Sequence, residues 1–116
     1  RGKKGNIAMI RHLKKGGFFA LLVDQDSHSG RPIKFLGQVA RTTTAPAEMA
    51  IRYDLPLVPV FATRQPNGQN IKIEYEKPII HSDAVTMTNE INKRISARIE
   101  KNPEQWYWLH NRWNKE

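Results

Sequence analysis

Three polar residues with possible binding chemistry stand directly after the longest uninterrupted apolar run of the sequence. Residues 18–23 read Phe-Phe-Ala-Leu-Leu-Val, and Asp24, Gln25 and Asp26 follow. Such a run predicts a strand covered on both faces. Because ligands collect at the carboxyl ends of strands in open α/β sheets, these three residues are candidate substrate-binding groups. The alternative is a turn whose aspartates bond backbone N–H groups.

Cations and hydroxyls that could meet an anionic ligand follow this acidic segment. Arg31, Lys34 and Arg41 come next along the chain, and a guanidinium can bind phosphate through two N–H groups. Thr43 belongs to a threonine run before a predicted helix, so its hydroxyl either caps that helix or helps bind an anion there. Arg31, Arg41 and Thr43 are therefore candidate substrate-binding residues, with ordinary surface charge as the alternative for the two arginines.

A short C-terminal segment, residues 103–113, holds all three tryptophans of the chain. Asn102 suits an N-cap and Pro103 suits the first helical position, so a terminal helix is expected. On that helix Arg112 would stack on Trp108, four residues earlier. His110 and Arg112 are candidates for holding a neighbouring element or a ligand. The whole segment could equally be a helix that docks its indoles into the core.

Metal binding and cofactor chemistry are not predicted. Asp24, Asp26 and His28 alternate along the chain, but a metal site would need further ligands, and only His81 and Asp83 offer a similar pair. We expect that second pair to lie in a solvated loop. The sequence has no cysteine and no self-sufficient catalytic signature, so no catalytic residue is assigned.

Periodicity predicts three helices around these candidates. The spacing of Ile7, Ile10 and Leu13 predicts a helix over residues 6–15, and a shorter helix is expected over 46–52. A basic amphipathic helix is expected over 88–101, where isoleucines recur every fourth residue.

The remaining segments are expected to be extended. Residues 33–40 read as short pieces broken at Gly37, and 57–62 as a buried strand that Pro59 confines to an edge or a bulge. A turn at 66–68 then leads into a strand with one covered face, formed by Ile71, Ile73 and Tyr75. Together these elements predict an α/β fold with a mixed sheet flanked by helices.

The size and charge of the chain limit its class. Its 116 residues suit one domain or part of one, and 19 basic against 11 acidic residues give a net charge of +8. This charge favours an anionic partner: nucleic acid, a phospholipid surface or a phosphorylated substrate. No apolar stretch is long enough to span a membrane, so any membrane contact would use basic residues and interfacial aromatics.

An ordered set of segments resembles a known family. The set comprises residues 13–16, 22–26, 35–37, 40–45, 55–61 and 103–113, the last reading Pro-Glu-Gln-Trp-Tyr-Trp-Leu-His-Asn-Arg-Trp. Together they resemble the bacterial lipid A biosynthesis acyltransferases over nearly the whole chain, and the tryptophan-rich segment is the most specific part. Residues 1–116 are thus expected to be the C-terminal part of one acyltransferase domain with a glycerolipid acyltransferase-like fold.

The resemblance implies transfer of a fatty acyl chain of the lauroyl or myristoyl type. The donor would be an acyl carrier protein thioester, and the acceptor a hydroxyl of a phosphorylated lipid A precursor bearing Kdo sugars. It implies a position on the cytoplasmic face of the inner membrane, in contact with the membrane surface, with a hydrophobic anchor before Arg1. Arg31 becomes the best phosphate-binding candidate, and neither a cofactor nor nucleic acid is expected.

The sequence departs from the family at the catalytic pair, a histidine followed five positions later by Asp or Glu. None of the four histidines has that partner: the residues found there are Gly17, Ile33, Thr86 and Lys115. We expect the pair to precede Arg1, the chain to be inactive alone, and apolar surface to be exposed where the rest of the domain packs. A nucleic-acid-binding module and a noncatalytic scaffold of the same family are the alternatives.

Overall fold

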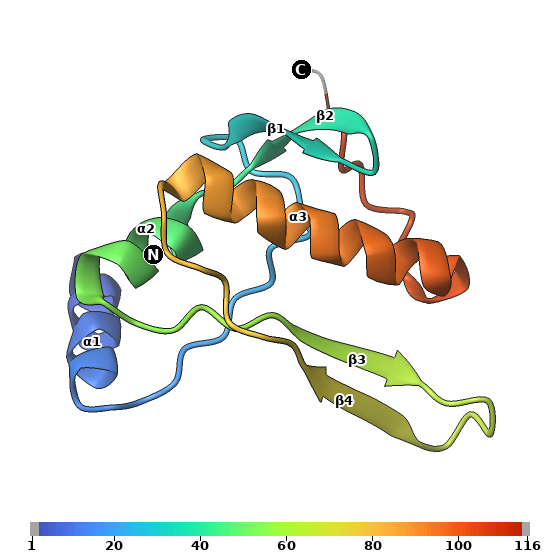
Figure 1. Cartoon of the computed structure of the whole chain (residues 1–116), viewed down its shortest axis with the longest axis horizontal. Coiled ribbons are helices and arrows are strands. Elements are labelled where there is room, and N and C mark those ends of the chain that lie inside the picture. The colour runs from blue at the N-terminus through green and yellow to red at the C-terminus, as the bar shows by residue number, and fades with distance from the viewer. Residues whose placement is uncertain (1–2, 115–116) are drawn as a thin grey trace.

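The computed structural model describes residues 3–114, which form three α-helices, two β-hairpins and one 3-10 turn (Figure 1). In chain order the elements are α1 (Lys3–Lys14), β1 (Arg31–Phe35), β2 (Gln38–Thr42), α2 (Ala45–Tyr53), β3 (Val60–Arg64), β4 (Ile71–Tyr75), α3 (Ala84–Lys101) and the 3-10 helix η1 (Pro103–Gln105). The predicted α/β class is confirmed. No helix among these residues is long and apolar enough to cross a membrane.

The strands of the described residues pair as two separate antiparallel hairpins rather than as one continuous sheet. β1 pairs with β2 through a two-residue turn in which Leu36 and Gly37 both have positive φ, at 49° and 79°. Tight hairpin turns need this backbone conformation, and glycine adopts it without strain. The predicted break at Gly37 is thus confirmed, as is the hairpin of β3 and β4 around residues 66–68.

The three predicted helices are present, and local chemistry sets their ends. α2 carries a proline in its first turn and ends at Asp54, which adopts the left-handed conformation with φ 50°. α3 begins after Asp83, whose carboxylate accepts a hydrogen bond of 2.8 Å from the Thr86 backbone N–H. This bonding lowers the pKa of Asp83. Asp83 is therefore a helix cap at an exposed position.

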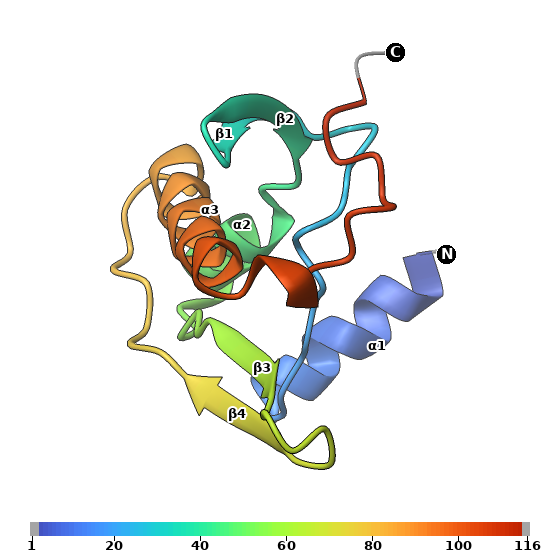
Figure 2. The ribbon, with the colours of Figure 1, turned by 90° about the vertical axis from the view of Figure 1, so that its right-hand side faces the viewer.

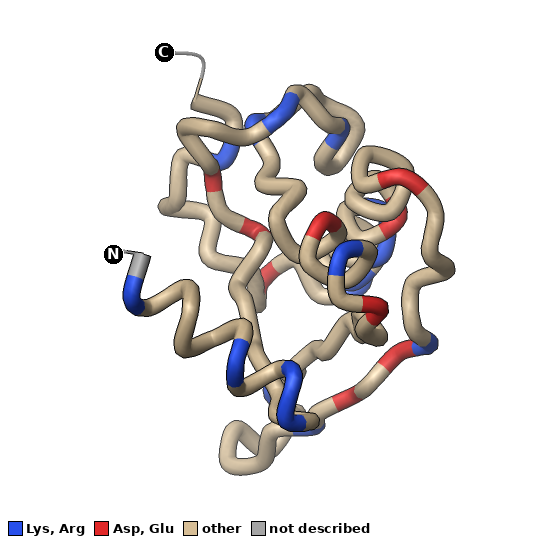
Figure 3. Tube along the Cα trace, turned by 90° about the vertical axis from the view of Figure 1, so that its left-hand side faces the viewer, with Lys and Arg blue, Asp and Glu red and all other residues tan. Residues whose placement is uncertain are grey.

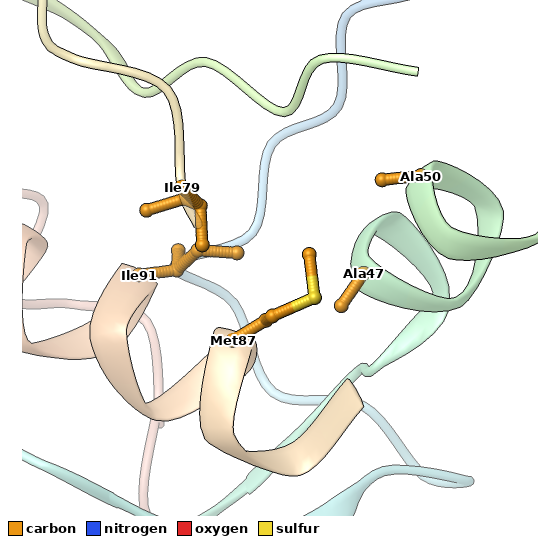
Figure 4. Close-up of a cluster of buried hydrophobic side chains, with 5 residues drawn as sticks. All are labelled: Ala47, Ala50, Ile79, Met87 and Ile91. Atoms are coloured by element: carbon orange, nitrogen blue, oxygen red, sulfur yellow. The ribbon is translucent and has the colours of Figure 1, made fainter. Parts of the chain in front are cut away.

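α3 runs between the two hairpins (Figure 2), and one side of it contributes Met87 and Ile91 to a first hydrophobic cluster and Ile99 to a second. The first cluster joins α3 to α2 and to the segment that precedes α3. Figure 4 shows the buried members of this cluster: Ala47, Ala50, Ile79, Met87 and Ile91. The second joins α3 to the β1–β2 hairpin and the C-terminal segment through Phe35, Ala40 and Ile99. Ile95 packs against both clusters.

The apolar run that precedes the two aspartates is not a buried strand, contrary to the sequence-based prediction. Residues 18–23 have no regular secondary structure, and the exposed fractions of Phe18 and Leu22 are 95% and 84%. Only Val23 packs against the first cluster. The run is apolar enough for a sheet centre, but the described residues offer it no paired neighbour on either side.

The covered face of the second hairpin is also the reverse of the predicted one. Ile71, Ile73 and Tyr75 are 64%, 59% and 75% exposed, while Glu74 on the opposite face is half-buried. That opposite face bonds α3, because Arg98 donates to Glu74 at 3.2 Å and to Glu76 at 2.8 Å. The pairing lowers the pKa of Glu74.

The strand expected over residues 57–62 begins only at Val60, and Val60 is half exposed, so the prediction of a buried strand is wrong. Pro59 lies just before β3, in keeping with its inability to donate to a strand ladder. The hairpin therefore presents an apolar outer face to solvent. This agrees with the expectation that the chain exposes apolar surface.

Candidate functional site

The candidate site lies where the C-terminal segment meets residues 24–26 and the end of β2. Figure 2 shows the C-terminal segment, in red, running beside the light blue segment that leads into β1. Hydrogen bonds tie the two together: the Asp26 backbone N–H donates to His110 Nε2 at 2.8 Å, and Trp106 Nε1 donates to Asp24 Oδ2 at 3.0 Å. Residues more than 80 positions apart thus form one group, which we call the acidic-loop cluster: Asp24, Asp26, Arg41, Trp106, His110 and Arg112.

Asp26 and Arg41 form a two-pronged ion pair at the centre of the cluster. Arg41 Nε donates to Asp26 Oδ1 at 2.9 Å, and Arg41 Nη2 donates to the other carboxylate oxygen. The hydrogen bond from Arg41 holds the pKa of Asp26 below its ordinary value of 3.8, and Asp26 in turn raises the pKa of Arg41. Because this fork-to-carboxylate geometry suits both groups, Asp26 stays charged and fixed at neutral pH.

Arg112 is fully buried beneath this pair. Its Nη1 donates to the Arg41 carbonyl oxygen at 2.7 Å, and its Nη2 donates to Thr42 Oγ1 at 2.8 Å. The guanidinium lies over the Phe35 ring, 4.6 Å from its centroid. Burial lowers the pKa of Arg112, opposed by the nearby charges of Asp26 and Asp24. The side chain therefore holds the C-terminal segment to β2.

The tryptophan-rich segment is not the expected helix. Only residues 103–105 form a 3-10 turn, and the chain then follows a series of bends. Trp106 and Trp113 pack on Phe35 with ring centroids 5.5 and 5.8 Å away, and Trp108 meets the edge of Trp106 at 4.6 Å. Arg112 consequently stacks on Phe35 instead of Trp108.

Partners outside the segment, Asp24 and Phe35, hold two of the three indoles and explain the loss of the helix. The indole N–H groups donate to Asp24, to the Pro103 carbonyl at 2.6 Å and to the Phe35 carbonyl at 3.2 Å, and these acceptors do not lie along one helical face. Tertiary contacts thus override the local helix signal. The predicted docking of indoles into the core is confirmed for Trp106 and Trp113.

The structure brings five of the eight predicted site residues together: Asp24, Asp26, Arg41, His110 and Arg112. Gln25 is exposed and lines a small pocket beside the cluster, together with Asp24, Trp106, Tyr107 and His110. Two predicted residues lie outside the cluster. Arg31 is an exposed residue at the start of β1, and the Thr43 hydroxyl accepts a 3.3 Å hydrogen bond from the Ala45 backbone N–H at the start of α2.

Two residues that support the cluster were not predicted. Thr42 Oγ1 accepts from Arg112 and, at 3.4 Å, from Asn92 Nδ2, and it donates to the Ala40 carbonyl at 3.1 Å. Thr42 belongs to the threonine run for which the sequence suggested either a helix cap or an anion contact. Asn92 is fully buried and donates to the Lys34 carbonyl at 3.0 Å. Its position directly after Ile91, on the apolar face of the helix, was a signal that could have marked it.

The hydrogen bonds of the cluster hold its loop in place. Among residues 3–114, His110 accepts from a backbone N–H, and His12 and His81 meet carbonyl oxygens. The described residues do not bring together three His, Cys, Asp or Glu side chains that could hold a metal ion. What the cluster does is lock the loop after residue 23 against β2.

A close backbone contact reinforces this lock. Gly30 donates to the Ser27 carbonyl at 2.8 Å, and a Cβ at Gly30 would lie 2.7 Å from the Thr42 backbone. Ser27 in turn donates from its backbone to the Arg41 carbonyl at 3.3 Å. The loop is therefore fixed to β2 by main chain as well as by side chains.

Comparison with known proteins agrees with the family resemblance that the sequence segments indicate. A family model described as "Bacterial lipid A biosynthesis acyltransferase" matches residues 2–115. The chain is also 31% identical over 112 residues to a lipid A biosynthesis lauroyltransferase of Escherichia coli (strain K12). That match covers 90% of this chain and 36% of the relative, so the chain spans about a third of the relative's length. The chain belongs to the bacterial lipid A biosynthesis acyltransferase family.

Proposed function

We propose that this chain forms the C-terminal part of an enzyme that transfers a fatty acyl group to a lipid A precursor. The family match over residues 2–115 is the observation that carries the proposal. The basic composition supports it, since a phosphorylated acceptor needs cations to bind it. The acyl donor in this proposal is the thioester of an acyl carrier protein.

The reaction is an acyl transfer from sulfur to oxygen. A histidine paired with a carboxylate accepts the proton of the acceptor hydroxyl, the oxygen attacks the thioester carbonyl, and the C–S bond breaks as the ester forms. The carrier thiolate takes up the proton. None of the histidines in this chain has the carboxylate five residues on, so the proposal places that pair elsewhere in the enzyme and predicts that this chain alone is inactive.

In this proposal the described residues shape the acceptor side of the site. The acidic-loop cluster holds residues 24–26 in place, which leaves the exposed Gln25 side chain open to a ligand. Arg31 is exposed and supplies a cation for a phosphate of the acceptor. The enzyme works at the cytoplasmic face of the inner membrane, where both carrier protein and lipid acceptor are within reach.

A chimera tests the proposal. The 112 matched residues of the E. coli lauroyltransferase are replaced by this chain, and acyl transfer from acyl carrier protein to a lipid A precursor is measured in detergent solution. We expect transfer by the chimera and none by the 116-residue chain alone. Acyl transfer by the 116-residue chain alone would refute the prediction that the catalytic histidine pair lies elsewhere in the enzyme. A folded chimera without activity would refute the proposed function.

Within that chimera, Arg31→Ala should raise the KM for the phosphorylated acceptor at least about tenfold, because a charge-assisted phosphate contact is worth about 1.5 to 3 kcal/mol. The KM for the acyl carrier protein should not change. Arg64→Ala, which removes another exposed arginine, is the matched control. Unchanged acceptor kinetics in Arg31→Ala would remove Arg31 from the site.

A further inference from the structure

Helix α1 carries positive charge without any compensating acid. Its twelve residues include no Asp or Glu, and Lys4, Arg11 and Lys14 are exposed, with the exposed Lys15 directly after the helix. Figure 3 shows basic residues along α1 and no acidic residue on it. None of the ion pairs found within residues 3–114 involves this helix. The charge of α1 is therefore available to a partner.

The basic residues of α1 lie on one face. Lys4, Arg11 and Lys14 follow at spacings of seven and three, which places them along the same side of a helix, and Ile7 falls between them. Ile7 is 56% exposed, whereas Met9, Ile10 and Leu13 on the other side are half-buried. The solvent face of α1 thus combines a row of cations with a single apolar side chain at its centre.

An exposed aromatic residue is fixed next to the basic end of this helix. The chain reverses at Gly16, where φ is 83°, and His12 Nε2 lies 3.1 Å from the Phe18 carbonyl oxygen. Gly17 packs so closely on the His12 ring that a Cβ there would lie 2.2 Å from it. The backbone of Phe18, whose side chain is 95% exposed, is thereby tied to the basic last turn of α1.

This combination fits the surface of an anionic lipid bilayer. Lysine and arginine bind lipid phosphates, while phenylalanine and isoleucine settle at the boundary between headgroups and acyl chains. α3 differs, because its exposed Lys93 and Lys101 alternate with Glu90 and Glu100. We infer that α1 and Phe18 form the surface by which this chain docks on anionic phospholipid. The inference rests on the proposed function only in placing the enzyme at a membrane.

Vesicle binding tests the inference with the 116-residue chain. The probe is vesicles of mixed phosphatidylglycerol and phosphatidylcholine, and co-sedimentation gives the affinity. Each lysine near a charged bilayer contributes about fivefold to binding, so Lys14→Gln/Lys15→Gln should weaken it about 25-fold. Lys93→Gln/Lys101→Gln removes the same charge from α3 and should change binding less than twofold. Phe18→Ser should weaken binding, and Leu109→Ser, at another exposed apolar residue, should not.

Several outcomes would overturn the docking surface. Equal losses in the α1 and α3 variants would show binding by net charge alone, and equal affinity for pure phosphatidylcholine would remove the electrostatic basis. Tighter binding to a single-stranded oligonucleotide than to the vesicles, or self-association through α1 in place of vesicle binding, would name a different partner. Acyl transfer by the chimera is measured in detergent without vesicles. A negative vesicle experiment therefore leaves the proposed function intact, and a negative transfer assay leaves the docking surface intact.

Discussion

At the residue scale, Arg112 is the most unusual side chain of the chain, because a charged group occupies a fully buried position. Its cost of desolvation is offset by two hydrogen bonds, by the Phe35 ring and by the charges of Asp24 and Asp26 nearby. A lysine could not reproduce the planar fork that reaches Arg41 and Thr42 together. The residue therefore acts as the anchor of the C-terminal segment.

Replacing Arg112 by Ala should lower the free energy of unfolding by about 3 kcal/mol, because it opens a cavity beside Phe35 and removes two charge-assisted hydrogen bonds, to Arg41 and Thr42. Arg112→Lys should fall between Arg112→Ala and the unmodified chain. Urea unfolding followed by tryptophan fluorescence measures both, with Arg64→Ala as a control expected within about 0.5 kcal/mol. A loss in Arg112→Ala no larger than that of the control would contradict the anchoring role.

The Asp26–Arg41 pair should make the free energy of unfolding depend on pH in the acidic range. The folded pKa of Asp26 lies below its ordinary value of 3.8, so its stabilising effect is complete above about pH 5 and is lost as the pH falls through the folded pKa. The difference in unfolding free energy between the unmodified chain and Asp26→Asn should therefore shrink below about pH 4. Denaturant titrations from pH 7 to pH 2.5 measure it.

The same titrations in an Arg41→Gln background provide the control for that prediction. With the guanidinium absent, Asp26→Asn should produce a much smaller pH-dependent difference, because the largest cause of the lowered pKa is gone. A difference that keeps its full pH dependence without Arg41 would assign the effect to another group.

At the element scale, helices could be predicted from the sequence more reliably than the tail and the apolar run. α2 and α3 have periodic apolar residues and local stop signals, and these depend only on near neighbours in the chain. The path of residues 103–113 depends on Asp24 and Phe35, which no local pattern reveals. The strand predicted at 18–23 failed for the related reason that a strand exists only with a paired neighbour.

Part of the candidate site followed from the same reasoning. Asp24 and Asp26 were expected at a loop that collects ligands, and their juxtaposition with His110 and Arg112 came only from tertiary structure. Arg41 was predicted as a ligand for an anion, and it meets the carboxylate of Asp26. Charge complementarity within a chain cannot be distinguished from affinity for a ligand by composition alone.

The outer face of β3 and β4 should tolerate polar substitution. Ile73→Thr should change the free energy of unfolding by no more than about 0.5 kcal/mol, because Ile73 is 59% exposed, whereas Met87→Ala in the first cluster should cost about 2 to 5 kcal/mol. Ile73→Thr should also reduce concentration-dependent association in sedimentation experiments, since it breaks the apolar patch. A large loss of stability in Ile73→Thr would mean that this face is covered.

At the scale of the whole molecule, α3 unites two hydrophobic clusters that would otherwise be independent. Ile95 packs against both clusters, and it therefore links the contact between α2 and α3 to the contact between α3 and the β1–β2 hairpin. Small domains that bury a single connected core unfold cooperatively. The described residues are therefore expected to unfold in one step despite having two separate sheets.

Ile95→Ala should lower the free energy of unfolding by about 2 kcal/mol or more. The urea transitions of both clusters should move to lower concentration by the same amount. Tryptophan fluorescence reports the second cluster and far-UV circular dichroism reports the helices, and the two urea transitions should stay coincident. Ile80→Ala, at an 87% exposed position, is the control and should leave both midpoints unchanged. Two separated transitions in the unmodified chain would contradict a shared core.

The contact between Asp26 and His110 selects one tautomer of the His110 ring. Because His110 Nε2 accepts a backbone N–H, it carries no proton of its own, and the hydrogen of the neutral imidazole must reside on Nδ1. The other tautomer would set an N–H against an N–H and open the contact. The loop that presents Gln25 is thus closed on one specific tautomer of His110, with the ring hydrogen on the nitrogen that faces away from Asp26.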